Sequence, residues 1–446
     1  MSIKLNKSLV NYVSRMLQPV SALPKDAIRH QQALSKSNRL MLDMGIIRQS
    51  YIGVYHLLPL GLRSLNKLKN LIRCRMNQIG AQELKMPLIV STDLWKKSGR
   101  WDAAGEEIFK LNDRHKKSFL LCPTNEESAA DLISTIRQLP HKSFPLLFYQ
   151  INTKFRDELR PRCGLIRARE FVMKDLYSFD TDEKKARETY QMVGKVYDEI
   201  FSDLGLNTLK VAADPGEIKG IFSHEYHIEC NEGEEVLNSC KKCGLTCIQN
   251  DWKECNNCKH AEFSVLNGLE VGHTFFLGTT YSDPLSAVFK LENNQMKHLM
   301  MGSYGLGVTR ILASSIEVLS NEEEIRWPHT IAPYRIVIIP PKEGSKESSS
   351  AYLQYEIYDI LNSQDHLKDD ILIDDRQRMT IGKRIVHAKM TGYPFIIVIG
   401  SKSLQNPPLV EVIDVYNDTS YDFTLDELTS FYMNEFQRNK QSVMKS

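Results

Sequence analysis

The sequence has 446 residues, of which 42% are hydrophobic and 25% charged, and its 57 Lys and Arg residues nearly balance 55 Asp and Glu residues. At ~100–200 residues per domain, this length predicts two or three domains, and the composition excludes a mostly disordered chain. Because the net charge is only +2, a nucleic-acid partner would have to meet a local basic surface, and no apolar run reaches the roughly 20 residues of a membrane helix.

The first 42 residues differ in composition from the rest of the chain. They hold seven Lys and Arg residues, several serines and a single acid, Asp26. Apolar residues at positions 3, 9, 10, 13 and 17 fit one face of a short helix. This pattern is typical of a mitochondrial transit peptide. The alternative is a basic N-terminal helix that packs on the body of the protein.

Residues 43–330 predict an α+β domain with an antiparallel sheet. A helix is expected over 61–79, where apolar residues recur at helical spacing, and another over 182–204. Strands are expected over 118–121, 146–155 and 171–179. A further strand over 83–90 contains Pro87, which cannot donate a ladder hydrogen bond and therefore favours an edge or interface position.

Residues 331–446 predict a separate α/β domain, with a boundary marked by Trp327-Pro328 and Pro333. Short runs rich in Ile and Val, at 334–340, 371–374 and 393–400, alternate with helical patterns at 349–361 and 382–389. Such an alternation indicates a small buried sheet with helices on its faces.

The densest chemical signal lies between Lys154 and Phe179. Six of its seven Lys and Arg residues are grouped here with its four carboxylates: Lys154, Arg156, Arg160, Arg162, Arg167, Arg169, Asp157, Glu158, Glu170 and Asp175. Clustered guanidinium groups suit a polyphosphate, because each binds phosphate oxygens in two places. Phe171 can stack on a base, and its even spacing from Arg167 and Asp175 predicts a shared strand face. The alternative is a surface hairpin laced with ion pairs.

A second signal is the glycine-rich run from Met301 to Arg310, which precedes a helical pattern. Gly305 and Gly307 would let the backbone approach a ligand closely. The run lacks the Lys-Ser/Thr of a P-loop, and Arg310 stands where a dinucleotide fingerprint has its third glycine. Taken alone, this run favours ordinary packing of a helix on a sheet.

Five of the nine cysteines lie between positions 240 and 258. Cys240 and Cys243, and then Cys255 and Cys258, form two Cys-x-x-Cys pairs that suit tetrahedral thiolate ligation of a structural Zn²⁺. Reduced free cysteines, left where a metal site has decayed, are the alternative. The total of nine cysteines is odd and most of them lie in this one cluster, which indicates a reducing compartment and not a disulfide framework.

Together these segments resemble class II aminoacyl-tRNA synthetases. Phe-Arg-x-Glu at 155–158, a loop, and Arg-x-x-x-Phe-x-x-x-Asp at 167–175 are similar to motif 2; Gly-x-Gly-x-x-Arg at 305–310 is similar to motif 3. The helix and interrupted strand over 61–90 look like motif 1, the dimer-interface element. Five segments narrow the resemblance to prolyl-tRNA synthetases of the bacterial and organellar type: 122–127, the hairpin around Arg156, 223–226, 268–275 and 327–333.

The resemblance spans about 45–440 and implies an α+β catalytic domain over 43–330, in which an antiparallel sheet has flanking helices. An α/β anticodon-binding domain over 331–446 would follow. The Cys-rich insertion at 231–266 is too short for the editing domain that bacterial members carry, so no cis editing is expected.

The resemblance also implies roles for site residues. Thr124 and Glu126 would hold the amino group of L-proline, and His273 would line its pocket. Arg156 would bridge the proline carboxylate and the α-phosphate of ATP, Glu158 would read the adenine amino group, and Arg310 would neutralise the γ-phosphate. Arg156, Glu158 and Arg310 are thus the expected catalytic residues. The ATP site would further contain Arg167, Phe171, Asp175, Gly305 and Gly307, with Mg²⁺ on the phosphates.

The implied partners are tRNA(Pro) and a second copy of the chain. The tRNA would contact Arg376, Arg378, Lys383 and Arg384, for which a charged, solvated loop is the alternative. The basic N-terminus and the missing editing domain favour the mitochondrial matrix over a bacterial cytoplasm. A non-catalytic, synthetase-like tRNA-binding subunit is the competing function, although such a paralogue should have lost some of the catalytic set.

Overall fold

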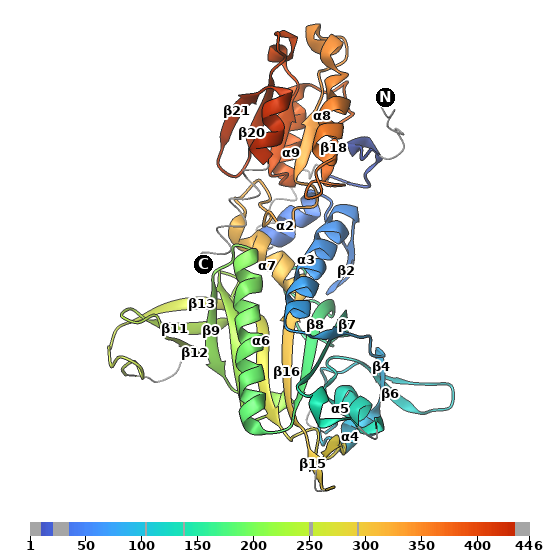
Figure 1. The fold of residues 1–446 in the computed structure, drawn as a ribbon, viewed down its shortest axis with the longest axis vertical. Coiled ribbons are helices and arrows are strands. Elements are labelled where there is room, and N and C mark those ends of the chain that lie inside the picture. Colours follow the sequence, from blue (N-terminus) through green and yellow to red (C-terminus); the bar gives the residue numbers. More distant parts are fainter. Residues whose placement is uncertain are drawn as a thin grey trace. The chain divides into compact units, whose positions relative to one another are not determined.

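The computed structural model describes residues 10–20, 35–102, 105–136, 139–248, 253–291 and 294–432 (Figure 1). The chain forms two compact units, neither of which is continuous in sequence. The first unit consists of Met1–Arg48, His56–Lys67 and Ser315–Ser446, and the second of Gln49–Tyr55 and Leu68–Ser314. Residues 43–48, 56–67 and 315–330, which were expected in the catalytic domain, therefore group with the C-terminal residues, as do residues 35–42 of the predicted N-terminal segment. Polar contacts such as Lys36 to the Ser320 carbonyl and Ser64 to the Ile331 carbonyl join them.

A nine-stranded sheet is the centre of the second unit. Its order is β12-β11-β13-β16-β8-β7-β3, and β10 pairs with β13 and β9. The strands are β3 (Gln82–Glu83), β7 (Leu146–Phe155), β8 (Glu170–Asp180), β9 (Thr208–Ala213), β10 (Phe222–Glu229), β11 (Glu235–Cys240), β12 (Thr246–Ile248), β13 (Phe263–Gly278) and β16 (Met300–Gly307). Every pairing is antiparallel except β3 with β7, which confirms the expected sheet type.

Helix α6 (Glu183–Asp203) covers one face of this sheet, where it packs on β8, β13 and β16 (Figure 1). Asp182 caps its first turn by accepting from the Lys185 N–H, and Gly205, with φ of +66°, follows its end. The residues predicted to face inward are all buried: Tyr190, Val193, Tyr197, Ile200 and Phe201.

A small sheet of order β4-β6-β5 leads into the loop that precedes α5. Its strands are β4 (Ile89–Ser91), β5 (Lys110–Asn112) and β6 (Ser118–Leu121), and helices α4 (Thr92–Lys97) and α5 (Glu126–Thr135) accompany it. Pro87 lies between β3, at the edge of the large sheet, and β4, so the predicted interruption separates two sheets. The small sheet has its own core of Val90, Trp95, Ile108, Leu120 and Cys122.

The first unit contains the predicted α/β domain, a five-stranded sheet of order β18-β17-β19-β20-β21. Its strands are β17 (Ile336–Ile339), β18 (Ile371–Ile373), β19 (Phe395–Val398), β20 (Val410–Asp414) and β21 (Thr419–Phe423), and helices α8 (Leu353–Asn362) and α9 (Ile381–Thr391) complete it. β17 pairs in parallel with β18 and β19, whereas β19, β20 and β21 are antiparallel.

The remaining elements connect these sheets. They are α2 (Lys36–Asp43), β1 (Ile47–Tyr51), β2 (Val54–Leu57), α3 (Pro59–Gln78), β14 (Val288–Lys290), β15 (Met296–His298), α7 (Val308–Leu319), and the 3-10 turns η2 (Val13–Arg15), η4 (His141–Ser143), η5 (Gly216–Ile218), η6 (Lys346–Ser350) and η7 (Ser401–Leu404). The predicted helix over 61–79 is thus confirmed as α3. In the described residues, no helix combines the length and apolar composition needed to cross a membrane.

The N-terminal segment packs on the C-terminal sheet. Tyr12 forms a parallel bridge with Ile373, whose N–H donates to the Asn11 carbonyl, and Val10 and Tyr12 are buried in the core of that domain. Ser14 donates two hydrogen bonds to Asp375. The predicted N-terminal helix lies partly outside the described residues, and within them only the single turn η2 is helical.

We expect the stability of the first unit to fall in acid. Burial is the main cause that lowers the pKa of His329 and His387 to about 4, with nearby Arg335 and Arg376 adding to it. Unfolded histidines take up protons near pH 6.5, while the folded ones stay neutral to about pH 4, so protons favour the unfolded chain in this window. Each histidine can account for up to roughly 3 kcal/mol, which is fully present above pH ~6.5 and lost as the pH falls toward ~4.

Chemical denaturation of the whole protein at about pH 7.5, 6 and 5 measures this loss. His387→Gln should reduce the pH dependence, since glutamine does not titrate. Equal free energies of unfolding at all three pH values would contradict the expectation.

Candidate active site

A pocket of about 240 Å³ lies where the β6–α5 loop meets the large sheet. Its walls come from that loop, from β8, β13 and β16, and from the start of α7. Ten residues predicted for the site line it: Thr124, Glu126, Arg156, Glu158, Phe171, Asp175, His273, Gly305, Gly307 and Arg310. The sequence analysis therefore identified most of one contiguous site. Arg167 borders an adjoining pocket of about 190 Å³ that shares Arg156, Glu158 and Arg310 with the first.

The carboxylate of Glu126 is the acceptor at one end of the pocket. Glu126 is the first residue of α5 and is buried, and it accepts hydrogen bonds from the Thr124 hydroxyl at 2.7 and 2.8 Å and from the Ser303 hydroxyl at 2.9 Å. The pocket thus presents a fixed anion, a suitable partner for a substrate ammonium group.

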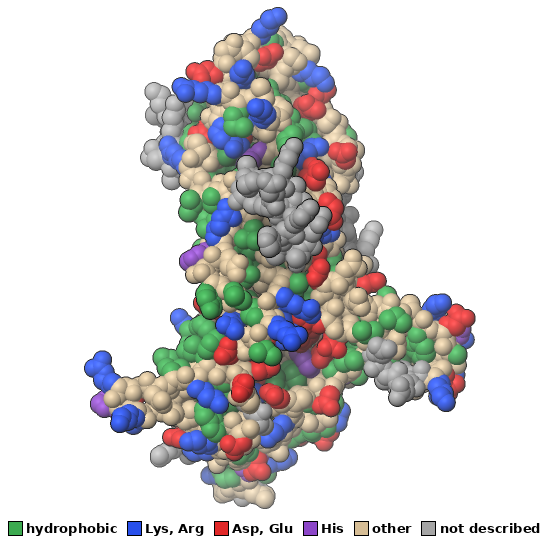
Figure 2. Space-filling model, turned by 180° about the vertical axis from the view of Figure 1, so that it is seen from behind, with side chains coloured by type: hydrophobic (Ala, Val, Ile, Leu, Met, Phe, Trp, Pro, Cys, Tyr) green, Lys and Arg blue, Asp and Glu red, His purple; other side chains and the backbone are tan. Residues whose placement is uncertain are grey.

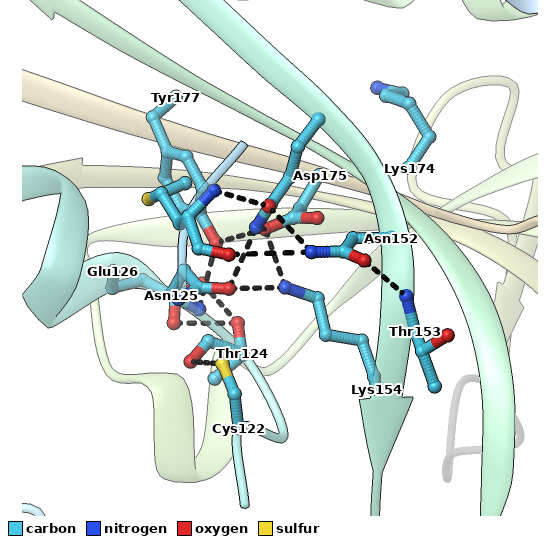
Figure 3. Close-up of polar contacts among 12 residues, drawn as sticks. Cys122, Thr124, Asn125, Glu126, Asn152, Thr153, Lys154, Lys174, Asp175 and Tyr177 are labelled. Atoms are coloured by element: carbon cyan, nitrogen blue, oxygen red, sulfur yellow. Dashed lines mark hydrogen bonds and ion pairs between the residues drawn. The ribbon is translucent and has the colours of Figure 1, made fainter. Parts of the chain in front are cut away.

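Asp175 lies beside this acceptor, in a network drawn in Figure 3. Its Oδ2 accepts from Gln150, Lys154 and Tyr177 at 2.9–3.0 Å, while its buried Oδ1 has no partner among the described residues. Lys154 and Gln150 also donate to the Asn125 side chain. Asp175, which was predicted as an ATP contact, lines the same pocket as Thr124 and Glu126.

The strand register explains this arrangement. In the β7–β8 pair, Gln150 lies opposite Asp175 and Lys154 opposite Phe171, so alternate residues of both strands face the pocket. The predicted shared face of Phe171 and Asp175 is confirmed in that both line the pocket.

A buried arginine that the sequence analysis missed lies behind Glu126. Arg100 donates to Glu126 at 3.3 Å and to both carboxylate oxygens of Glu127 at 3.2 Å. It comes from the turn after α4, and no motif or periodicity marks it. Nearby, burial raises the pKa of Cys122 to about 12, which excludes this thiol as a nucleophile at neutral pH.

Two arginines form the other end of the pocket. The Arg156 guanidinium lies 5.4 Å from the Phe171 ring, and no hydrogen bond or ion pair to it is found within the described part of the chain. Its desolvation, together with the charge of Arg310, lowers its pKa. Arg310 donates to the Ile166 and Glu270 carbonyls at 2.8 and 2.9 Å. Arg156 is therefore a cation that no carboxylate of the described residues contacts directly, although the charges of Glu270, Glu158 and Glu107 act on it.

Glu270 is a second residue that the sequence analysis missed. Desolvation opposes its ionisation, but the hydrogen bond from His273 and the charges of Arg310 and Arg156 outweigh it and lower its pKa to about 2. The β10–β13 register slips at this point, because Tyr226 pairs with Gly272 but His227 with Glu270. The extra residue turns Glu270 to the face of His273, which strict alternation would not predict.

His273 lies against the pocket wall, as expected. Its ring stacks on Phe275 with centroids 3.8 Å apart, and its Nδ1 is 3.3 Å from Glu270. The buried Nε2 has no partner among the described residues. A Cβ added at Gly305 would come no closer than 3.9 Å to protein atoms, so packing does not demand a glycine there. A ligand that approaches the Gly305 backbone would require a glycine at this position.

Glu158 and Arg167 contact each other. The Arg167 Nε donates to Glu158 at 2.7 Å, and its Nη1 donates to Glu234, also at 2.7 Å. Arg167 is therefore held by carboxylates and borders only the adjoining pocket, while Glu158 lines both pockets.

The cysteine cluster forms a compact ligand set in the second unit. The Sγ atoms of Cys240, Cys243, Cys255 and Cys258 all lie within 4.8 Å of one another, and two of the S–S separations are 3.5 Å. Four thiolates about 2.3 Å from a tetrahedral zinc would be roughly 3.8 Å apart, so the set fits this metal.

The cations predicted to contact tRNA have different surroundings. Arg378 is exposed, as is Lys383 in the first turn of α9, whereas Arg376 forms an ion pair with Asp374 at 2.7 Å. Arg384 corrects the prediction: it is fully buried and donates to the Asp374 and Pro340 carbonyls. Its guanidinium is used inside the domain and is not available to a nucleic acid.

The chain matches two family models that correspond to its two functional parts. The tRNA synthetase class II core domain (G, H, P, S and T) matches residues 109–319, and the anticodon binding domain matches residues 335–434. The Giardia lamblia prolyl-tRNA synthetase, solved in complex with prolyl-adenylate, has the same fold, with a TM-score of 0.77 at 20% identity over 93% of this chain and 82% of that one.

Relatives with higher identity cover nearly the full length. The probable mitochondrial proline–tRNA ligase of Rattus norvegicus is 42% identical over 90% of this chain and 86% of its own length. That of Schizosaccharomyces pombe is 36% identical over 92% and 96%, and the proline–tRNA ligase of Ehrlichia chaffeensis is 36% identical over 89% and 94%. The chain belongs to the proline–tRNA ligases, within the class II aminoacyl-tRNA synthetases.

Proposed function

We propose that the chain joins L-proline to tRNA(Pro) in two steps at the pocket described above. A proline carboxylate oxygen attacks the α-phosphorus of ATP, the bond to pyrophosphate breaks, and prolyl-adenylate forms. A hydroxyl of the tRNA 3′-terminal adenosine then attacks the prolyl carbonyl, and AMP leaves. Both steps need alignment and charge neutralisation and no protein nucleophile.

Each residue is assigned a role from its position in the pocket. Glu126 and Thr124 bind the proline ammonium, and Arg156 neutralises charge where the proline carboxylate meets the α-phosphate. Phe171 stacks on adenine, and Arg310 binds the terminal phosphate. The ionised Glu270 is an oxygen ligand of the kind that Mg²⁺ prefers, and Mg²⁺ bound with ATP would supply further positive charge to the phosphates.

The observation that carries this proposal is the unpaired Arg156 guanidinium in the same pocket as the Glu126 carboxylate. A zwitterionic amino acid has an anion for the first and a cation for the second. A merely structural arginine would be expected to have an acceptor, as Arg384 and Arg310 do.

Proline-dependent ATP–pyrophosphate exchange tests the proposal. Arg156→Ala should lower exchange by about 10²–10³-fold or more, because a charge-neutralising donor is lost from the transition state. Arg162→Ala is the matched control: this arginine lies in the same loop, is 56% exposed and pairs with Glu234, so near-normal exchange is expected.

Alanine, cysteine and threonine are the comparison substrates. We propose that the chain has no cis editing domain, and a pocket that differs by a methylene discriminates only ~10–200-fold, so weak exchange with alanine is expected. Folded protein that exchanges with no amino acid would favour the competing reading, a non-catalytic tRNA-binding subunit.

We propose a homodimer formed through the region around Pro87. An apolar groove of about 570 Å³ there is lined by residues that include Met86, Pro87 and Leu94, and Ile89 and Leu132 are 53% and 38% exposed on it. Exposed apolar side chains of this kind favour a protein interface.

Sedimentation velocity measures the dimer directly. Ile89→Asp should shift the protein toward monomer, because it places a charge in the interface. Val265→Asp, at a side chain that is 66% exposed elsewhere in the second unit, should leave the dimer intact. A monomeric wild-type protein at micromolar concentration would refute the assembly.

The tRNA is proposed to meet two basic surfaces. Arg376, Arg378 and Lys383 lie around the start of α9 in the anticodon-binding domain. Lys, Arg and His side chains also project at the tip of the β5–β6 hairpin, visible at the left of Figure 2, where Arg114, Lys116 and Lys117 are exposed. We place the protein in the mitochondrial matrix, because several relatives are named mitochondrial, with a bacterial cytoplasm as the alternative.

We propose that the four cysteines bind a structural Zn²⁺. Purified protein should contain one zinc per chain, and Cys240→Ser with Cys255→Ser should abolish it, since two thiolate ligands are lost. Metal analysis after dialysis measures the zinc content. Cys74→Ser, at an exposed cysteine outside the cluster, is the control and should keep the metal. Protein purified without added chelator that holds no zinc would contradict the assignment.

A further inference from the structure

We propose that Arg100 is a positioning residue for the amino-acid substrate. It holds the Glu126 carboxylate, and the buried charged groups around Glu126 keep a net charge of one negative until proline binds. The inference rests on the proposed function and concerns a residue outside the predicted motifs.

The turn after α4 places Arg100 next to Glu126, which lines the pocket. Helix α4 ends at Lys97 with Ser98 as its C-cap, and Gly99 adopts a left-handed φ of +71°, so the chain turns back and the Arg100 N–H donates to the Trp95 carbonyl. The guanidinium lies 4.5 Å from the Trp95 ring and 5.8 Å from the Tyr281 ring, and the residue is only 5% exposed. Aromatic rings near the guanidinium restrict its movement.

The contacts of Arg100 divide its charge between two carboxylates. Its Nη1 donates to Glu126 Oε2 at 3.3 Å and to Glu127 Oε1 and Oε2 at 3.2 Å. Glu126 lines the pocket and Glu127 does not. Glu127 is otherwise bonded only by a neutral donor, the Ser98 hydroxyl at 2.9 Å, among the side chains of the described residues. Arg100 is thus the cation that balances Glu127 while it orients Glu126.

The buried carboxylates and cations around Glu126 are unequal in number. Three buried carboxylates, Glu126, Glu127 and Asp175, face two buried cations, Arg100 and Lys154. Counted as ionised, the cluster has a net charge of one negative. A buried, uncompensated charge is unfavourable, and a substrate ammonium placed against Glu126 removes the imbalance. The arrangement therefore favours a cationic amine at this position over a neutral ligand of the same shape.

Arg100→Gln tests the inference in the exchange assay with the whole protein. Without the guanidinium, the two glutamates repel each other and one takes up a proton. The KM for proline should rise about 10- to 100-fold, since a charged hydrogen-bond network is lost, while the KM for ATP changes less than ~3-fold. The titratable and charged groups around the two glutamates are Arg100, Cys122, Lys154, Asp175, Tyr177 and Tyr281.

A pH profile separates charge from packing. In Arg100→Gln, rising pH removes the added proton from the glutamate pair, so the KM for proline should fall with rising pH more steeply than in the wild type. Arg100→Lys should recover part of the affinity, because it restores the charge without the forked geometry.

Removing the charge of Glu127, with and without Arg100, gives the decisive comparison of KM values for proline. Glu127→Gln alone leaves Arg100 to neutralise Glu126 and should raise the KM for proline about 10-fold. Combining it with Arg100→Gln restores one net negative charge and should lower that KM relative to Arg100→Gln alone. Ser98→Ala removes a neutral bond to Glu127 and is the control, with a change below ~3-fold.

An unchanged KM for proline in Glu127→Gln, or no recovery in the double variant, would overturn the proposal even if Arg100→Gln fails to fold. Wild-type exchange with proline is measured first, and its absence would refute the proposed function itself. The two failures are therefore distinct.

Discussion

The pocket depends on buried carboxylates that are surrounded by cations and hydrogen-bond donors. Burying a carboxylate is unfavourable unless such partners replace the water that it loses. Glu126 meets the requirement through Thr124, Ser303 and Arg100, and Asp175 through Lys154, Gln150 and Tyr177. These partners come from the β6–α5 loop, the turn after α4, β7, β8 and β16. The binding site therefore forms only when the small sheet has docked on the large one.

The two arginines at the opposite end of the pocket differ in their contacts. There no hydrogen bond or ion pair to the Arg156 guanidinium is found among the described residues, whereas Arg310 is held by backbone carbonyls and Glu270. Contacts within the protein therefore restrain one arginine more than the other. This asymmetry fits chemistry in which charge moves at the α-phosphorus while the terminal phosphates are only held in place.

Local patterns were sufficient to predict much of the fold. The bounds of β6 and β7 agree with the predicted strands, because turn residues limit those apolar runs, and α6 has a cap at each end that the sequence displays. Two-residue alternation correctly placed Phe171 and Asp175 on one face. The residues that were missed depend on irregular or distant geometry: Glu270 requires a bulge, and Arg100 requires a left-handed turn and a partner 26 residues away. Arg384 looked like a surface cation because periodicity cannot show that a helix turns an arginine toward buried carbonyls.

The contact between the N-terminal segment and β18 affects how the chain folds. Tyr12 pairs with Ile373, so residues made early in translation complete a sheet whose strands are made near the end. Until then the edge of β18 has open backbone groups, and the apolar side chains of Val10 and Tyr12 have no core to enter. The two paired residues lie far apart in the sequence, and such contacts slow folding because the closing loop is large. Loss of residues 10–12 would therefore leave the backbone edge of β18 at Ile373 without this partner and remove Val10 and Tyr12 from the core of the anticodon-binding domain.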